Sequence, residues 1–446
     1  MDRQEKFTIA LLTIVAVMVG IGTNFPTAKS PKSKCFPCPN EPNAPKESPE
    51  EKVAKVQGLP DTSPGGKSSN VMRVAIANFS ANPSGLQAAP AVSQQGLALQ
   101  KAPQKASEQL DLSNKWDRAL EKATLAVELG KDTNASAETL AKAQSLWQEA
   151  IELLHQIPKD ADLGKKSAKK IEQYKGNLAN IEYRLETAQS DFLQPIAQRS
   201  GLSSKVKITI CHLHSGRCRR LRGNERPRSV ASLMKVPVAV ALMHKLTTDK
   251  IRFDTPIYVD RGNFTEDASH IRVGQTYSLE RLLTEMIALS SNIATNQLID
   301  YLGWNYINRI LQERGFQNTR IQYKVVGDKI WPRNPGFRAN TSTADELTDM
   351  MLAIYNREHL GDEILIRALE RQYDRALGFA GLEGAQGKWL GEKTGQTSRV
   401  LGTTLAMNLF GETYVITVID DGFYSEPSIR NFIEEIAEYI FRNGHI

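Results

Sequence analysis

The sequence predicts an α+β fold for the C-terminal half of the chain, with one antiparallel sheet flanked by a cluster of helices. Strand patterns stand at both ends of residues 198–446 and helical patterns lie between them, which favours one sheet built from distant segments. The 446 residues are too many for one ordinary domain. We expect a membrane helix over 1–28, a flexible tether over 29–108 and a small all-α bundle over 109–192 to precede the α+β domain.

The composition is that of a globular protein with a modest positive charge. Hydrophobic residues make up 41% of the chain and charged residues 24%. The net charge of +6, from 56 basic and 50 acidic residues, is small for this length and indicates no nucleic-acid partner. Four cysteines are too few for a disulfide scaffold, so the core must come from apolar burial.

The first 28 residues predict a membrane segment. A short charged head precedes an uncharged, apolar run from Phe7 to Gly22, and the absence of charge continues to residue 28, which is long enough to span a bilayer as a helix. A retained signal anchor and a cleaved signal peptide both fit this pattern. We favour the anchor, because Asn24 to Pro26 interrupt the small-residue cleavage pattern. Basic residues flank both ends, so the positive-inside rule does not set the orientation.

Residues 29–108 predict a flexible tether. They are rich in Pro, Ser, Gly, Ala and Lys and have almost no aromatic residues, so they cannot bury enough apolar surface to offset the chain entropy. Cys35 and Cys38 form a CxxC pattern here, but no second pair lies nearby and no βαβ pattern surrounds it. A local disulfide or two inert thiols are therefore favoured over a zinc or redox site.

Residues 109–192 predict a helical bundle. Helical patterns cover three segments, 116–127, 140–154 and 164–188. A Trp-x-x-Ala motif at Trp116 recurs at Trp147, which is similar to the helical hairpins of tetratricopeptide repeats. Two copies leave two interpretations open: a plain three-helix spacer, or a docking module for a protein partner.

The region 198–446 contains the strand and helix patterns of the α+β domain. Its first two strands are joined at His214-Ser215-Gly216, which is a hairpin signal. Strands are expected over 206–212, 218–222, 400–409 and 412–420. Helices are expected over 232–247, 278–288, 292–302, 304–314, 342–356 and 427–442.

The first hairpin carries two cysteines and a run of arginines. An oxidising compartment would favour a bridge between Cys211 and Cys218, but the sequence leaves open whether the register brings them opposite one another. Six arginines lie between residues 217 and 228. Such a run is typical of a solvated face, and contact with an anionic wall polymer or lipid headgroups is the alternative.

One short motif supplies a candidate nucleophile. Ser232-Leu-Met-Lys235 opens an apolar helical run, and residues three apart on a helix share one face, so the amine of Lys235 can approach the hydroxyl of Ser232. A serine hydroxyl is a poor nucleophile until a neighbour takes its proton. A lysine can take it when desolvation and nearby cations favour its neutral form.

Two further motifs follow in order along the chain. Ser290-Ser291-Asn292 could relay a proton to a leaving nitrogen and hold a substrate amide. Lys393-Thr394-Gly395 leads into a strand, where Lys393 and Thr394 could meet a substrate carboxylate. Gly395 would let substrate approach the backbone closely.

This ordered set resembles the class A serine β-lactamases and the penicillin-binding proteins, whose signature is SxxK, then S-D-N or a relative, then K-T-G or a relative. Here 58 positions separate Ser232 from Ser290 and 103 separate Ser290 from Lys393, close to class A spacing. Flanking segments at 282–287 and 340–344 are also similar to those of the family. The resemblance covers about 200–446 and implies a β-lactamase/transpeptidase-like fold.

The resemblance also implies a role for each motif residue. Ser232 would be the nucleophile, Lys235 the general base or its relay, and Ser290 the group that transfers a proton. The substrate-binding residues would be Asn292, Lys393, Thr394, Gly395 and Gln396. The oxyanion would lie between the backbone N–H groups of Ser232 and Gln396, preorganised donors of the kind that contribute most to catalysis.

One departure from the family concerns deacylation. Class A enzymes carry a glutamate in the loop before Asn340 that activates the deacylating water, but the segment from Arg320 to Phe337 contains no glutamate. An ungapped alignment places Val325 at that position, and Asp328 is the only carboxylate nearby. We therefore expect acylation with slow turnover, unless a different loop path lets Asp328 substitute.

These observations predict a membrane-anchored serine hydrolase that forms a seryl acyl-enzyme with β-lactams and hydrolyses them slowly. A D-Ala-D-Ala carboxypeptidase that acts on peptidoglycan peptides is the first alternative, and a non-catalytic sensor or scaffold is the second. The chemistry implies a catalytic domain on the extracytoplasmic, periplasmic side of the cell membrane. The seven histidines are scattered, so no metal is expected, and nothing in the motifs calls for a cofactor.

Overall fold

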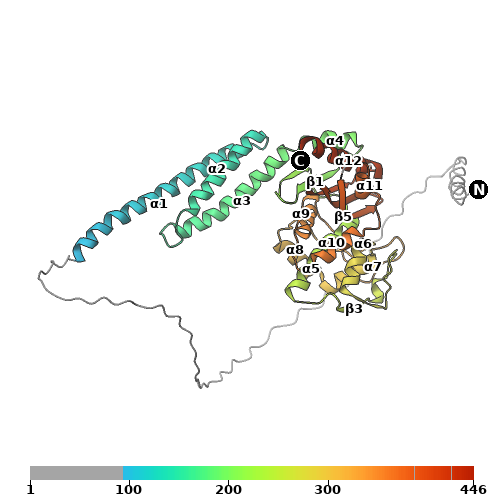
Figure 1. The fold of residues 1–446 in the computed structure, drawn as a ribbon. Coiled ribbons are helices and arrows are strands. Elements are labelled where there is room, and N and C mark those ends of the chain that lie inside the picture. Colours follow the sequence, from blue (N-terminus) through green and yellow to red (C-terminus); the bar gives the residue numbers. More distant parts are fainter. Residues whose placement is uncertain (1–93, 386, 423) are drawn as a thin grey trace, which may run out of the picture. The chain divides into compact units, whose positions relative to one another are not determined.

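The computed structural model of the protein describes residues 94–385, 387–422 and 424–446, with side chains from residue 107 onward (Figure 1). The expected membrane helix over 1–28 and the cysteines at 35 and 38 lie outside these residues. Within the described ranges, no helix combines the length and the apolar character needed to cross a membrane.

The described chain begins with three helices that pack on one another. They are α1 (Gln94–Gly130), α2 (Ala137–His155) and α3 (Gly164–Ala188). Their buried residues form one apolar cluster, in which the rings of Trp147 and Tyr174 lie 4.9 Å apart. Helix α1 begins at Gln94 and not near residue 109, so the tether prediction is wrong for residues 94–108. Ala, Leu, Gln and Lys dominate there, and these residues favour helix.

The following domain is built on one antiparallel sheet, as predicted, and the sheet has five strands where the sequence predicted four. The strands are β1 (Lys207–His212), β2 (Cys218–Leu221), β5 (Gly387–Thr397), β6 (Val400–Leu409) and β7 (Glu412–Asp420). Their order is β2-β1-β7-β6-β5, so the last three strands of the chain pair beside the first two. Strand β5, which carries Lys393 to Gly395, is an edge strand.

Helices cover both faces of this sheet, which explains why β1, β6 and most of β7 are buried along their length. One face packs on α4 (Leu193–Arg199), α11 (Gly378–Leu382) and α12 (Glu426–Asn443) (Figure 1). The other face packs on a larger group: the 3-10 helix η1 (Ala231–Met234), α5 (Lys235–Thr248), α6 (Leu279–Ala288), α7 (Asn292–Leu302), α8 (Trp304–Glu313), α9 (Ala344–Tyr355) and α10 (Asp362–Glu370).

The predicted helices and strands of this domain are present within a few residues of the expected bounds. Four short helices and strands were not predicted: α4, α11 and the two-stranded sheet β3 (Pro256–Tyr258) and β4 (Thr276–Ser278). Helix α10 and the 3-10 turn η2 (Arg261–Asn263) were not predicted either. Most of these elements are too short to show a hydrophobic period, and their positions depend on packing.

Side-chain caps fix the starts of several helices. The hydroxyl of Ser278 accepts the backbone N–H of Arg281 at the start of α6, and the hydroxyl of Thr343 accepts that of Glu346 at the start of α9. Helix α5 has no such cap, but nearly every side chain from Lys235 to Met243 is buried. A helix that is apolar all round belongs inside a core, and this burial holds the start of α5 in place.

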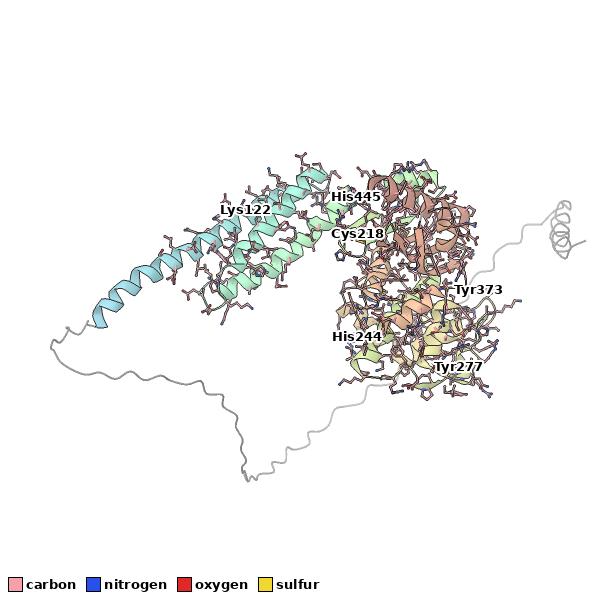
Figure 2. The ribbon with its side chains drawn as sticks, viewed as in Figure 1. Lys122, Cys218, His244, Tyr277, Tyr373 and His445 are labelled. Carbon is pink, nitrogen blue, oxygen red and sulfur yellow. A yellow bond between two sulfur atoms is a disulfide. The ribbon has the colours of Figure 1, made fainter. Side chains whose placement is uncertain are left out.

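The hairpin of β1 and β2 departs from the sequence prediction in its arginines. Cys211 and Cys218 lie opposite one another in the register and are joined by a disulfide (Figure 2). The arginine run is not a solvated face throughout, because Arg219 is buried and Arg220 lies between Glu186 and Asp345 as ion pairs. Glu186 and Asp345 are distant in sequence from Arg220, so the sequence pattern does not reveal that they pair with its charge.

Candidate active site

The three motifs meet at one cavity of about 220 Å³. It lies where η1 packs against β5 and where the turn between α6 and α7 reaches the start of α5. Its lining residues are Ser232, Leu289, Ser290, Gln372, Tyr373, Asp374, Thr394, Gly395 and Gln396. Five of the nine are residues that the sequence predicted. Lys235, Asn292 and Lys393 line no part of this cavity; Lys235 and Lys393 contact residues that do, and Asn292 contacts Lys235.

Lys235 is the centre of the hydrogen-bond network. Its side chain is fully buried, and its Nζ lies 2.9 Å from the hydroxyl of Ser232 and 2.9 Å from the hydroxyl of Ser290. The same atom donates to the carbonyl of Ser290 at 2.8 Å and to Oδ1 of Asn292 at 2.9 Å. The start of α5 thus brings one amine within reach of both candidate serines.

Burial and a second cation favour the neutral form of Lys235. Burial holds the pKa of this amine well below its ordinary value, and the charge of Lys393 lowers that pKa further, while Asp267 opposes the shift. A neutral amine can accept the proton of a neighbouring hydroxyl. The Lys235 side chain therefore has both the position and the electrostatic surroundings of a general base toward Ser232.

Ser290 adopts a backbone conformation that serine rarely takes. Its φ is +54°, in the left-handed region, which costs a non-glycine residue about 1 kcal/mol or more. This conformation turns both its carbonyl and its hydroxyl toward Lys235. The surrounding structure holds the turn, because Ser291 caps α7 by accepting the N–H of Ala294.

Ser291, at the middle position of the second motif, has a structural role. It is fully buried, donates to Oδ2 of Asp267 at 2.6 Å and receives a hydrogen bond from Ser269 at 2.9 Å. Asp267 also accepts the N–H of Ile293 at 2.9 Å. Sequence reasoning missed Asp267, because no motif links it to a segment more than twenty residues later. Its carboxylate anchors the turn that positions Ser290 and Asn292.

Lys393 is the second buried cation of the site. It is fully buried, donates to the carbonyl of Thr394 at 2.9 Å and lies 3.5 Å from Oε1 of Gln372. Burial lowers its pKa to about 8, against the opposing charges of Asp374 and Glu392. Gln372 in turn donates to the hydroxyl of Thr394 at 3.2 Å, so it links the two residues that the third motif offers to a carboxylate.

Gly395 is required by a close approach of two backbone segments. A Cβ at this position would lie 3.1 Å from the backbone nitrogen of Ser232 and 3.0 Å from that of Leu233. Strand β5 therefore runs directly beside the N–H of the candidate nucleophile. Gln396, the next residue on the strand, lines the same cavity as Ser232. The backbone N–H groups of these two residues are the predicted oxyanion donors.

The segment from Gln372 to Asp374 forms the mouth of the cavity and was not predicted. The N–H of Tyr373 donates to the carbonyl of Ala288 at 2.8 Å, which ties the segment to the end of α6. The Tyr373 side chain is 82% exposed and stands at the surface (Figure 2). No local pattern marks these residues, so only the fold brings them to the site.

Asp328 is exposed and is not among the residues that line the cavity at Ser232. Val325, which the alignment placed at the glutamate position of class A enzymes, is held by both ends of one amide side chain. The Asn296 side chain accepts its N–H at 2.7 Å and donates to its carbonyl at 2.9 Å. The loop therefore fixes an apolar residue there.

An antiparallel sheet between two layers of helices, with a serine and two buried lysines at one edge, defines a β-lactamase-like α+β domain. The sequence model of the Beta-lactamase enzyme family matches residues 190–443, more than half of the chain, and the chain belongs to this family. No curated protein matches the chain.

Solved structures of similar fold come from several proteins. A β-lactamase from Sphaerobacter thermophilus DSM 20745 is 22% identical and covers 56% of this chain and 97% of its own, with a TM-score of 0.48. PBP-A is 22% identical and covers 57% and 97%, with a TM-score of 0.49. An ancestral class A β-lactamase is 22% identical and covers 57% and 98%, with a TM-score of 0.47. At these identities the likeness concerns the fold alone.

Proposed function

We propose that residues 198–446 are a serine hydrolase that forms a seryl acyl-enzyme with β-lactams and hydrolyses the β-lactam amide slowly. The observation that carries the proposal is the position of Lys235. Its buried amine, with a pKa well below the ordinary value, lies 2.9 Å from the hydroxyls of both Ser232 and Ser290. One group can therefore take a proton from the nucleophile and pass it toward the leaving nitrogen.

Acylation follows from these contacts. Lys235 takes the proton of Ser232 as Oγ attacks the lactam carbonyl, and the oxyanion is held by the backbone N–H groups of Ser232 and Gln396. The C–N bond then breaks, and the proton passes through Ser290 to the nitrogen. Thr394, which lines the cavity, and the positive charge of Lys393 beside it bind the substrate carboxylate. A charge-assisted hydrogen bond is about twice as strong as a neutral one.

Deacylation is the slow step in this proposal. Water must add to the seryl ester and return a proton to Ser232, and a general base there contributes roughly 100-fold to 10,000-fold. Val325 has no group that can act as this base. Asp328 is exposed and lines no part of the cavity, which favours a long-lived adduct.

Slow deacylation also favours a second candidate, a D-Ala-D-Ala carboxypeptidase that acts on peptidoglycan peptides. Such a peptide presents the same carboxylate and amide to the site as a penicillin does. The observation that favours this candidate is the fixed Val325, since a peptidase has no need to clear penicillin rapidly.

We further propose that the apolar segment near the N-terminus anchors the protein in the cell membrane, with the catalytic domain on the extracytoplasmic side. The uncharged run from Phe7 to Gly22 supports the anchor. The disulfide between Cys211 and Cys218 supports an oxidising compartment, where such bonds persist. Protease protection in intact cells, compared with lysed cells, tests the orientation.

The test of the acyl-enzyme is covalent labelling of the full chain with a fluorescent penicillin, followed by intact-protein mass. We expect an adduct on the wild type that persists for minutes, none on Ser232→Ala, and an unchanged lifetime on Asp328→Asn. Release of D-alanine from a peptide ending in D-Ala-D-Ala separates the peptidase from the β-lactamase. Folded wild-type protein that forms no adduct would sink the acyl-enzyme proposal and favour a sensor or scaffold.

A further inference from the structure

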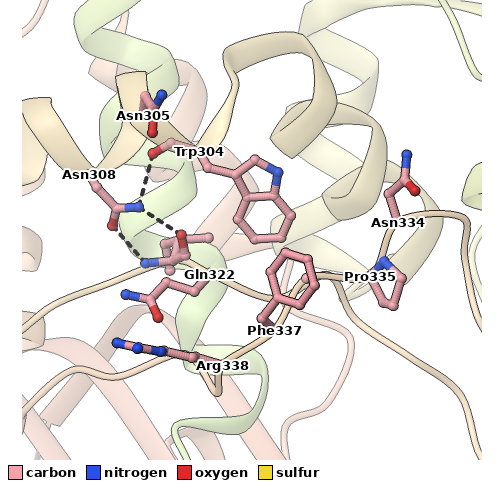
Figure 3. A pocket seen from close by; sticks show the side chains of 10 residues that line it. Trp304, Asn305, Asn308, Gln322, Asn334, Pro335, Phe337 and Arg338 are labelled. Carbon is pink, nitrogen blue, oxygen red and sulfur yellow. Dashed lines mark hydrogen bonds between the residues drawn. The ribbon is translucent and has the colours of Figure 1, made fainter. Parts of the chain in front are cut away.

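A second cavity, larger than the one at Ser232, lies between α8 and the loop 321–338 (Figure 3). Its volume is about 690 Å³, and it shares no lining residue with the cavity at Ser232. The first turn of α8 supplies Trp304, Asn305 and Asn308, and the loop supplies the remaining walls. Neither the sequence motifs nor the proposed chemistry uses any of these residues.

Hydrogen bonds hold the walls of this cavity in place before any ligand binds. The side chain of Asn308 donates to the carbonyls of Trp304 and Ile321 at 2.9 and 2.8 Å, and it accepts the N–H of Ile321 at 2.9 Å (Figure 3). Across the loop, the N–H of Lys324 donates to the carbonyl of Pro335 at 2.7 Å. A ligand would therefore meet a formed site, as small-molecule sites usually are.

Gly336 lets the loop lie against the tryptophan ring. Its φ is +103°, and a Cβ there would lie 2.1 Å from the carbonyl oxygen of Gln322 and 3.0 Å from the ring of Trp304. Any side chain at this position would push the ring away. Glycine at this position therefore leaves space for the Trp304 ring, which lines the cavity.

The lining combines aromatic faces with polar side chains that have no partner. Trp304 and Phe337 both line the cavity (Figure 3), and the Phe337 side chain is fully exposed at 101%. The amides of Asn305 and Gln322 and the guanidinium of Arg338 line the same space. Among the described residues, these three side chains have no hydrogen-bond partner, and no carboxylate lines the cavity.

We propose that this cavity is a saccharide-binding site. A pyranose has an apolar C–H face that packs on an aromatic ring, and a rim of hydroxyls that both donate and accept hydrogen bonds. Side-chain amides also do both, and the guanidinium donates. A purely apolar ligand that covered the amides of Asn305 and Gln322 would leave them unpaired. A polyanion would meet Arg338 as the one cation among the residues that line the cavity. The proposal is independent of the seryl chemistry.

The test is isothermal titration of the full chain with a tetramer of N-acetylglucosamine. We expect saturable binding to the wild type and equal binding to Ser232→Ala, because the two cavities are separate. Phe337→Ala should weaken binding roughly tenfold, since a stacked aromatic contact contributes up to about that factor. Arg338→Ala is the second test variant. The matched control is Trp331→Ala, on the same loop and 62% exposed but outside the cavity.

Several results would overturn the saccharide site. The first is no saturable binding to the wild type. The second is equal weakening by Trp331→Ala and Phe337→Ala, which would mean a general effect of loop aromatics. The third is binding of a D-Ala-D-Ala peptide to Ser232→Ala that depends on Phe337, with no binding of the saccharide. An unchanged thermal midpoint of each variant shows that the fold is intact.

Discussion

Lys393 provides a test of the electrostatic account of the site, through the variant Lys393→Met. The side chain is fully buried, and its hydrogen-bond partners are the carbonyl of Thr394 at 2.9 Å and Gln372 at 3.5 Å. Methionine is unbranched and of similar length, so it fills the same space without a charge. We expect the variant to be more stable at pH 7 and slower to react with penicillin.

The magnitude follows from the pKa of Lys393, which burial lowers from 10.5 to about 8. At about 1.4 kcal/mol for each pKa step, the charged form costs the folded protein about 3 kcal/mol at neutral pH. Loss of the hydrogen bonds offsets about 1 kcal/mol of this gain. Lys393→Met should therefore raise the free energy of unfolding by about 2 kcal/mol at pH 7.

The pH dependence gives this prediction its sharpest form. Between pH 8 and 10.5 the unfolded chain binds a proton that folded Lys393 has released, so the wild type gains stability as pH rises through this window. The advantage of Lys393→Met must shrink by about 3 kcal/mol across the same range. The matched control is Lys388→Met, because Lys388 is an exposed lysine on the same strand. The difference in unfolding free energy between this variant and the wild type should stay below about 0.5 kcal/mol over the same change in pH.

The assay is urea unfolding of the wild type, Lys393→Met and Lys388→Met at pH 7, 8.5 and 10.5, followed by tryptophan fluorescence. The rate of labelling by fluorescent penicillin at pH 7 is measured in parallel, and we expect Lys393→Met to reduce it roughly 10-fold to 100-fold, because a hydrogen bond to a charged group contributes about 1.5 to 3 kcal/mol. A stability difference that stays constant with pH would refute the lowered pKa of Lys393.

Three other variants test separate parts of the structure. Val325→Glu should shorten the life of the penicillin adduct about 100-fold or more, as a general base does, and an unchanged lifetime in intact-mass time courses would contradict the role given to this position. The double variant of Cys211 and Cys218 to alanine should lose about 2 kcal/mol of stability in urea, since the bridge closes a short loop; equal stability of the reduced wild type and the variant is the control. Burial raises the pKa of Glu392 to about 7. The wild type should therefore lose stability relative to Glu392→Gln as pH rises from 4.5 to 8. A stability difference that does not change with pH in thermal scans would show that Glu392 is not held protonated.

The sequence could place the candidate nucleophile beside its candidate base because the proposed chemistry fixes residue types at short spacing. Ser232 and Lys235 lie one helical turn apart, so a local pattern already states that their side chains meet. Much of the sheet could be predicted for a similar reason, since β1, β6 and β7 are rich in apolar and β-branched residues. Strand β5, which is polar over much of its length, was not among the expected strands. By contrast, Asp267 and Gln372 contact the site through bonds to residues more than twenty positions away. No spacing rule covers such contacts.

The arginine run shows where composition misleads. The pattern predicted a solvated face, yet Arg220 is partnered by Glu186, which lies on α3, and by Asp345, which lies on α9. A charge is buried only where the fold supplies its partners, and neither partner is near in sequence. The same holds for the amides beside Trp304, whose common cavity appears only once α8 and the loop are placed together.

The energetics of the site argue for a use of its chemistry. Lys235 and Lys393 are both fully buried; burial disfavours the charged form of each, and the charge of Lys393 further disfavours the charged form of Lys235. Ser290 holds a strained backbone conformation beside them. A non-catalytic scaffold would become more stable by exchanging either lysine for an apolar residue. A chain that keeps both lysines, the strained serine and a glycine beside the N–H of Ser232 bears a stability cost, and this cost supports the acyl transfer that we propose at Ser232.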